Sequence, residues 1–330
     1  MATQLSTFRS IILPVETEAP RPLWSVMIPS YNCADYLRET LTCVLAQDLG
    51  LEIMQIEVVD DHSTQDDPEA VVKEVGKGRV SFYQQPQNVG YIKNFETCLQ
   101  RARGHLIHLL HGDDLVRDGF YRKLQTAFEE NPDIGAAFCR SIYIEPDGIW
   151  ETFTTLERRT SGVLENWLEK ISSGQRLLPP SIVVRRQVYE KLGGFDSRFT
   201  CAGEDWEMWV RIATTFPVWY EVLPLAEYRV RRPGSLTGNT TRKGKFSQDM
   251  ILATEIVESY LSDYLPPQKA AKMIRQAKQL CAFWALEAAT CALIDNNFSV
   301  FMTQVQQAFK CDTSLKTARA VVKLLLKKAL

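Results

Sequence analysis

Several common functional signatures are missing from this 330-residue sequence. Its eight cysteines are scattered without a CxxC pair, and its four histidines form no HExxH motif. We therefore expect neither disulfides nor a zinc site, and the cysteine pattern is typical of a reducing, cytoplasmic compartment. Neither GxGxxG nor GxxxxGK[ST] occurs, so the common dinucleotide-binding and P-loop fingerprints are excluded.

Excess charge and long apolar runs are also lacking. The sequence holds 38 Lys and Arg against 40 Asp and Glu, without the basic excess of a nucleic-acid-binding protein. No uninterrupted apolar run reaches the roughly 20 residues that cross a bilayer, and the N-terminus does not resemble a signal peptide. The composition, with 45% hydrophobic and 24% charged residues, is that of a soluble globular protein of one large or two modest domains.

Apolar runs alternate with helical patterns through the first half of the chain. Strand-like runs lie at 24–28, 56–59, 79–83, 105–110 and 134–144, with helix-like segments between most of them. This alternation predicts an α/β, Rossmann-like fold whose mostly parallel sheet carries helices on both faces. In such sheets ligands bind outside the carboxyl ends of the strands.

Polar clusters follow three of these strands, at residues 30–32 (SYN), 60–61 (DD) and 112–114 (GDD). The sheet topology predicts that they converge at one edge. Adjacent carboxylates repel each other unless they face solvent or share a cation, and hard cations prefer oxygen ligands. Two interpretations of 112–114 stay open on this basis: a metal site, or a surface turn whose Asp residues cap the next helix.

A second acidic cluster stands at residues 203–207 (GEDWE). Glu204 and Asp205 suit the first turn of a helix, where carboxylates complement the helix dipole. A carboxylate beside tryptophans also suits a general base in a partly apolar pocket. The basic run at 228–232 (YRVRR) indicates either a solvated surface or an anion contact.

The sequence pattern predicts three regions. Residues 1–22 form a loose N-terminal arm, 23–240 a catalytic domain, and 241–330 a helical C-terminal domain. The catalytic domain divides into a nucleotide-binding half (23–115) and an acceptor half (116–240). The last helix is basic and amphipathic, which is typical either of a solvated helix packed on its own domain or of a helix on an anionic membrane; its basic residues are Lys316, Arg319, Lys323, Lys327 and Lys328.

Together these residues resemble the family 2 glycosyltransferases, which have the GT-A fold. The resemblance covers roughly residues 24–237 and depends on six motifs in order: 28–32 (IPSYN), 58–63 (VVDDHS), 88–90 (NVG), 112–114 (GDD), 193–196 (GGFD) and 203–205 (GED). It implies an inverting enzyme of cell-surface polysaccharide biosynthesis that uses a nucleoside-diphosphate sugar and Mg²⁺ or Mn²⁺. The glutamine-rich tryptophan motif and membrane helices of processive synthases are absent, so we expect transfer of a single sugar.

The resemblance also implies roles for individual residues. Asp205 would be the catalytic base, and Asp113 the main metal ligand with Asp114 beside it. The residues expected at the donor are Pro29, Ser30, Tyr31, Asn32, Asp60, Asn88, Lys93, His111, Arg229 and Arg231. Two positions depart from the family pattern. His111 stands where Asp or Thr is common, and Arg231 replaces a frequent histidine, which favours a phosphate contact by Arg229 or Arg231.

The expected partners follow from this resemblance. The donor would be a UDP-sugar or a related sugar nucleotide, and the acceptor a saccharide or lipid-linked saccharide, with no nucleic acid involved. A lipid-linked acceptor would explain the basic segment 313–330 through peripheral contact with the inner face of the membrane, and self-association is a further hypothesis. One alternative is a non-catalytic, degenerate transferase that binds nucleotide sugars or acts as a scaffold. A sugar-nucleotide pyrophosphorylase would need a glycine- and arginine-rich N-terminal loop, which residues 30–32 do not supply.

Overall fold

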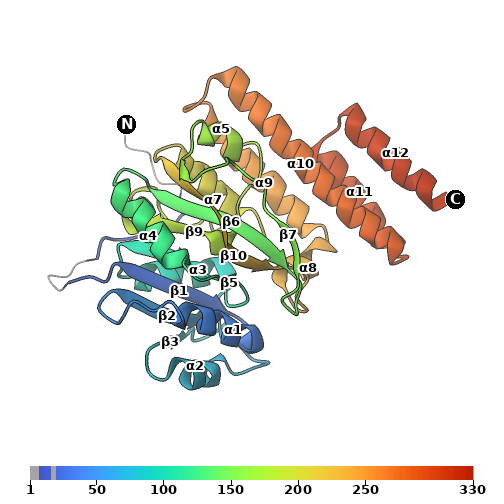
Figure 1. The fold of residues 1–330 in the computed structure, drawn as a ribbon. Coiled ribbons are helices and arrows are strands. Elements are labelled where there is room, and N and C mark those ends of the chain that lie inside the picture. Colours follow the sequence, from blue (N-terminus) through green and yellow to red (C-terminus); the bar gives the residue numbers. More distant parts are fainter. Residues whose placement is uncertain (1–6, 16–19, 330) are drawn as a thin grey trace. The chain divides into compact units, whose positions relative to one another are not determined.

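The computed structural model describes residues 7–15 and 20–329 (Figure 1). The chain divides into two compact units. The first, here called the sheet unit, comprises Met1–Glu165, Arg176–Ser197 and Thr215–Val230. The second, the helical unit, comprises Asn166–Gln175, Arg198–Thr214 and Arg231–Leu330. Two early segments of the helical unit, 166–175 and 198–214, come from the stretch that the sequence analysis assigns to the catalytic domain.

The sheet unit is built on one mixed sheet with the strand order β3-β2-β1-β4-β9-β6-β10-β5, to which β7 adds beside β6 and β8 beside β10. The strands are β1 (Trp24–Ser30), β2 (Met54–Asp60), β3 (Ser81–Gln84), β4 (Leu106–Leu109), β5 (Leu115–Val116), β6 (Ala136–Ile144), β7 (Trp150–Phe153), β8 (Gly162–Val163), β9 (Ile182–Arg185) and β10 (Val218–Arg229).

The first four strands of this order, β3 to β4, are parallel to one another. Every residue of β1 and β4 is buried, which explains their near-continuous apolar sequences. Antiparallel pairs occur where β9 joins β4 and β6, whereas β6 and β10 are again parallel. The parallel pairing predicted from the sequence therefore covers β3 to β4 and the β6–β10 pair. The predicted α/β class with a C-terminal helical region is confirmed.

Helices pack against this sheet, with α3 (Tyr91–Arg101) against β1 and β2, and α4 (Phe120–Glu130) against β6 and β10. Their amphipathic sequences place Leu37, Leu41 and Val44 of the first helix in the core. The helices of the sheet unit are α1 (Ala34–Leu45), α2 (Pro68–Gly76), α3 (Tyr91–Arg101), α4 (Phe120–Glu130), the short 3₁₀ helix η1 (Pro179–Ser181) and α6 (Arg186–Leu192).

Residues 8–13 do not form the loose arm that the sequence predicted. The Phe8 carbonyl accepts a hydrogen bond from Ser197 N–H, and the Ser10 carbonyl accepts one from Gly194 N–H. Ile12 is fully buried in the same stretch. These backbone contacts hold the segment on the sheet unit, although its sequence carries no periodic pattern. Residues 1–6 and 16–19 of the expected arm lie outside the described residues.

The helical unit consists of helices, and short connections join the last five of them, α8 to α12. They are α5 (Trp167–Ile171), α7 (Glu204–Ala213), α8 (Leu236–Thr241), α9 (Lys245–Leu261), α10 (Pro267–Ile294), α11 (Phe298–Cys311) and α12 (Leu315–Ala329). The central helix α10 packs against α9, α11 and α12. By length and composition α10 could cross a membrane, but 39% of its most apolar window is buried inside the structure, and core helices of globular bundles meet the same criteria.

The last helix, α12, buries Thr317 and Val321 against its neighbours and exposes Leu315, Val322 and Leu326. The side chains of Lys327 and Lys328, which belong to the predicted basic face, lie outside the described residues. The contact of residues 313–330 with a membrane stays a prediction.

Candidate active site

Three loops of the sheet unit begin where neighbouring parallel strands end. Ser30 ends β1 and is in register with Asp60, the last residue of β2. The turn 111–114 follows β4, which pairs with the other side of β1, and Gly112 N–H donates to the Pro29 carbonyl at 3.1 Å. A Cβ atom on Gly112 would lie 3.1 Å from Cys33 Sγ, so glycine permits this close approach. The predicted convergence of the three polar clusters is confirmed.

Asp60 is fully buried and its carboxylate is fixed by the turn after β2. It accepts hydrogen bonds from Ser63 N–H at 2.8 Å, from Ser63 Oγ at 2.6 Å and from Gln84 Nε2 at 3.1 Å. The Asn32 side chain links the first two loops, because its Oδ1 accepts from Thr64 N–H at 3.0 Å. Ser63, which the sequence analysis quoted only as part of a motif, therefore orients Asp60 directly.

Asp61 holds the next loop instead of facing a ligand. Its carboxylate accepts from Val89 N–H at 2.7 Å and Gly90 N–H at 3.0 Å, and its carbonyl accepts from Asn88 Nδ2 at 3.1 Å. Burial raises the pKa of Asp61, and the two backbone donors oppose that shift. Two other predicted donor residues, Tyr31 and Lys93, expose their side chains at the same end of the sheet unit.

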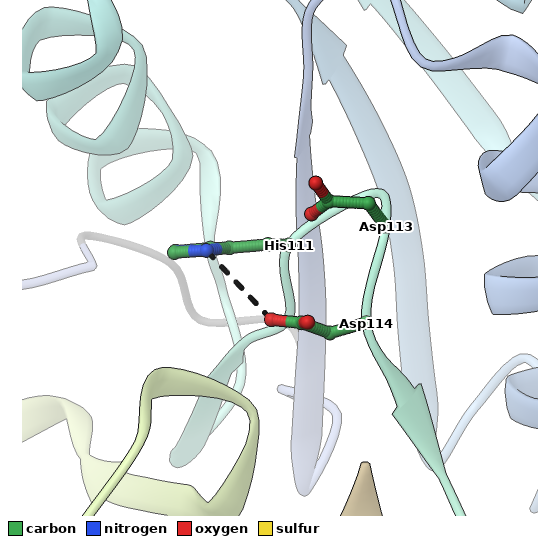
Figure 2. A group of neighbouring side chains, drawn as sticks. All are labelled: His111, Asp113 and Asp114. Atoms are coloured by element: carbon green, nitrogen blue, oxygen red, sulfur yellow. Dashed lines mark ion pairs between the residues drawn. The ribbon is translucent and has the colours of Figure 1, made fainter. Parts of the chain in front are cut away.

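His111, Asp113 and Asp114 bring their side chains together (Figure 2). One potential ligand atom from each lies within 4.8 Å of the others, and His111 Nδ1 is 3.9 Å from Asp114 Oδ2. The imidazole stacks on the Phe95 ring with centroids 5.1 Å apart. Burial lowers the pKa of His111, and the Asp113 carboxylate opposes this shift. The imidazole is therefore neutral at pH 7, which leaves one ring nitrogen as an electron-pair donor.

Arg229, the last residue of β10, holds the turn 111–114 through hydrogen bonds. Its backbone N–H donates to Asp114 Oδ1 at 2.9 Å, and its Nε donates to the Asp113 carbonyl at 3.0 Å. The remaining guanidinium nitrogens bind the Pro146 carbonyl at 2.6 Å and the Glu39 carboxylate at 2.8 Å. The family resemblance favours a phosphate contact by Arg229 or Arg231, whereas these contacts commit the Arg229 guanidinium to protein acceptors. Arg229 is thus a positioning residue for Asp113 and Asp114.

The three side chains fit a divalent cation by their chemistry. Two carboxylates supply the oxygen ligands that Mg²⁺ and Mn²⁺ take in proteins, and a neutral imidazole is a ligand for transition metals. Asp114 is 1% exposed, and its Oδ1 is oriented by the Arg229 N–H, the kind of outer support that metal ligands commonly have.

Asp205 lies in the first turn of α7, within the helical unit. Its Oδ1 accepts from Trp206 N–H at 2.7 Å, and its Oδ2 accepts from Gln175 Nε2 at 2.6 Å. Burial raises the pKa of Asp205 to about 6, while both hydrogen bonds lower it. The carboxylate is therefore fixed in orientation and has a pKa near neutrality. Gln175 was missed by the sequence analysis, because it lies in a stretch without a recognisable pattern.

The start of α7 is anchored from α9. The buried Asp249 carboxylate accepts from Thr200 N–H and Cys201 N–H, both at 2.7 Å, and from Ala202 N–H at 3.3 Å. Gly203 then adopts a positive φ of 87° directly before the helix. A Cβ atom on residue 203 would also lie only 3.0 Å from the Ala253 Cβ, so this position before the helix requires glycine. Arg231, another predicted donor residue, is exposed with a φ of 55° in the same unit.

Comparisons with known proteins find sequences and folds that are similar over most of this chain. The uncharacterised protein MT1568 of Mycobacterium tuberculosis is 29% identical over 267 residues, which cover 74% of this chain and 79% of that one. Among solved structures, TarS residues 1–349 of S. aureus in complex with UDP-GlcNAc matches with a TM-score of 0.65 and 14% identity, covering 87% of this chain and 81% of that one.

A second solved structure is similar over a comparable length. The mannosyltransferase PcManGT of Pyrobaculum calidifontis, in complex with GDP-Man and Mn²⁺, matches with a TM-score of 0.54 and 18% identity, covering 92% of this chain and 88% of that one. The model of the glycosyl transferase family 2 matches residues 25–193, just over half of the 330-residue chain. The chain therefore belongs to glycosyl transferase family 2.

Proposed function

We propose that this glycosyltransferase moves one sugar from a nucleoside-diphosphate sugar to an acceptor hydroxyl with inversion. The observation that carries the proposal is the Asp205 carboxylate, which two hydrogen bonds orient and whose pKa burial raises to about 6. Such a group is ionised at neutral pH and is basic enough to take a proton in the transition state. In a single displacement, the acceptor oxygen attacks the anomeric carbon, its proton passes to Asp205, and the nucleoside diphosphate leaves with the electron pair of the broken bond.

The donor would bind at the strand ends of the sheet unit. Asp60 is held rigidly enough to receive a base or ribose group, with Pro29, Ser30, Tyr31 and Asn32 completing that loop. UDP-GlcNAc in the TarS complex and GDP-Man in the PcManGT complex support a nucleotide-sugar donor, and we propose a UDP-sugar.

Asp113 and Asp114 would hold the divalent cation, which would neutralise charge on the leaving diphosphate. The Mn²⁺ in the PcManGT complex supports this part of the proposal. Arg229 would contribute by keeping the turn in place, through its bonds to the Asp113 carbonyl and to Asp114 Oδ1.

The Asp113→Ala substitution tests the donor and cation sites together. Because Arg229 binds the backbone carbonyl of Asp113, this hydrogen bond should persist in the variant while one cation ligand is lost. We expect Mn²⁺ to tighten UDP binding to the native protein, measured by calorimetry, and this enhancement to fall at least about tenfold in the variant. If Mn²⁺ tightened UDP binding equally in the native protein and the variant, Asp113 would not be a ligand of the cation. Lys123→Ala, at an exposed position on α4, should leave the Mn²⁺ enhancement in place.

A further inference from the structure

The turn 111–114 brings one histidine, His111, beside two carboxylates, Asp113 and Asp114. A carboxylate in place of His111 would give a site with oxygen ligands alone. His111 Nδ1 points towards Asp114 Oδ2 at 3.9 Å, a separation beyond a hydrogen bond (Figure 2). Two ligands that each lie about 2.1 Å from one cation are at most about 4.2 Å apart. The observed separation therefore leaves room for a cation between these two atoms.

The surroundings hold His111 in this orientation. Its ring stacks on Phe95 at an interplanar angle of 25°, which restricts rotation of the imidazole. Asp114 is oriented on the other side by the Arg229 N–H, which binds Oδ1 and leaves Oδ2 as the oxygen that faces the imidazole. Two independent contacts thus fix the donor atoms relative to each other before a cation binds.

The chemistry of an imidazole differs from that of the carboxylate it replaces. Mg²⁺ is a hard cation that prefers oxygen ligands, whereas imidazole nitrogen suits first-row transition metals, whose affinities rise from Mn²⁺ to Co²⁺. Replacing a carboxylate with a neutral ligand also removes one negative charge, which weakens the electrostatic attraction for every divalent cation. A favourable metal–nitrogen bond offsets this loss for transition metals but not for Mg²⁺.

We propose that His111 Nδ1 is a third protein ligand of the cation held by Asp113 and Asp114, and that it makes this site selective for Mn²⁺ and Co²⁺ over Mg²⁺. This inference deepens the proposed function, since it takes the cation site as given and assigns its selectivity to one residue.

The experiment compares metal affinities of the full-length protein and its variants without any nucleotide. Isothermal calorimetry would give the dissociation constants for Mg²⁺ and Co²⁺, and the visible absorption of bound Co²⁺ would report nitrogen ligation. We expect Co²⁺ to bind at least about a hundredfold more tightly than Mg²⁺. In His111→Asp the ratio of the Mg²⁺ dissociation constant to the Co²⁺ dissociation constant should fall at least about tenfold. His111→Ala should weaken Co²⁺ binding without strengthening Mg²⁺ binding.

A matched control is His105→Asp, because His105 is exposed and precedes β4 at its other end. This variant should keep the native ratio. A ratio and a Co²⁺ spectrum unchanged in His111→Asp would overturn the proposal. If Co²⁺ binding then still depended on Asp113, the cation site of the proposed function would stand without His111. Co²⁺ binding that no longer depended on Asp113 would contradict both the cation site and the role of His111 in its selectivity.

Discussion

Asp205 is a partly buried carboxylate in the first turn of α7. Its pKa is raised to about 6 by burial, and the Gln175 and Trp206 donors limit that rise by stabilising the charged form. The unfolded chain would titrate this group near 4, so between about pH 4 and pH 6 the folded state binds more protons. The contribution of Asp205 to the free energy of unfolding therefore decreases as the pH rises through this window.

The same pKa predicts the pH dependence of turnover. Since a base must be ionised, the rate should fall about tenfold for each unit of pH below about 6 and level off above 7. Gln175→Ala removes a donor that favours the charged form, so it should move this acid limb to higher pH. Initial rates of nucleoside diphosphate release between pH 4.5 and 8.5 would measure both profiles. A limb near pH 4 in the native enzyme, or one unmoved by Gln175→Ala, would contradict this assignment.

At the scale of elements, α7 depends on α9 for the geometry of its first turn. Asp249 accepts three successive backbone N–H groups in the connection before α7, and it is itself buried. Unsatisfied buried donors are costly, so the loop and the helix start should loosen without this carboxylate.

Asp249→Ala should lower the free energy of unfolding by about 2–4 kcal/mol, because the buried N–H groups of Cys201 and Ala202 and the part-buried N–H of Thr200 lose their acceptor. Asp249→Asn keeps one acceptor oxygen and should lose less. Urea unfolding followed by circular dichroism would measure these differences. Glu255→Ala, at an exposed position on the same helix, is the matched control and should change stability by no more than about 0.5 kcal/mol. An effect of Asp249→Ala as small as this control would show that α9 does not anchor the start of α7.

The elements also show where sequence reasoning succeeded and where it could not. Continuous apolar runs predicted β1, β2 and β4, and 3.6-residue periodicity predicted α1, α4 and the helices after residue 245. The long strand β10 was not predicted, because its sequence VWYEVLPLAEYR contains a proline and its pairing with β6 shifts register around Pro224. Strands with irregular pairing lose the alternation on which such predictions depend.

On the scale of the whole molecule, motifs located the acidic groups but not the contacts that organise them. The strand-end positions of Asp60 and Asp113 followed from parallel topology alone. The function of Arg229 as a support depends on Glu39 and Pro146, which lie 190 and 83 residues away in the sequence. The division into two units likewise unites 166–175 and 198–214 with the C-terminal helices, which no local pattern shows.

The proposed role of Asp205 as the base of a sugar transfer is tested most directly by Asp205→Asn. The measurement is the rate of nucleoside diphosphate release from the proposed UDP-sugar donor with Mn²⁺, together with the affinity for that donor. We predict that the rate falls at least about a hundredfold while donor affinity stays within about twofold. Glu204→Gln, in the same helical turn, should retain most of the native rate. An Asp205→Asn protein that releases UDP at the native rate would contradict the account.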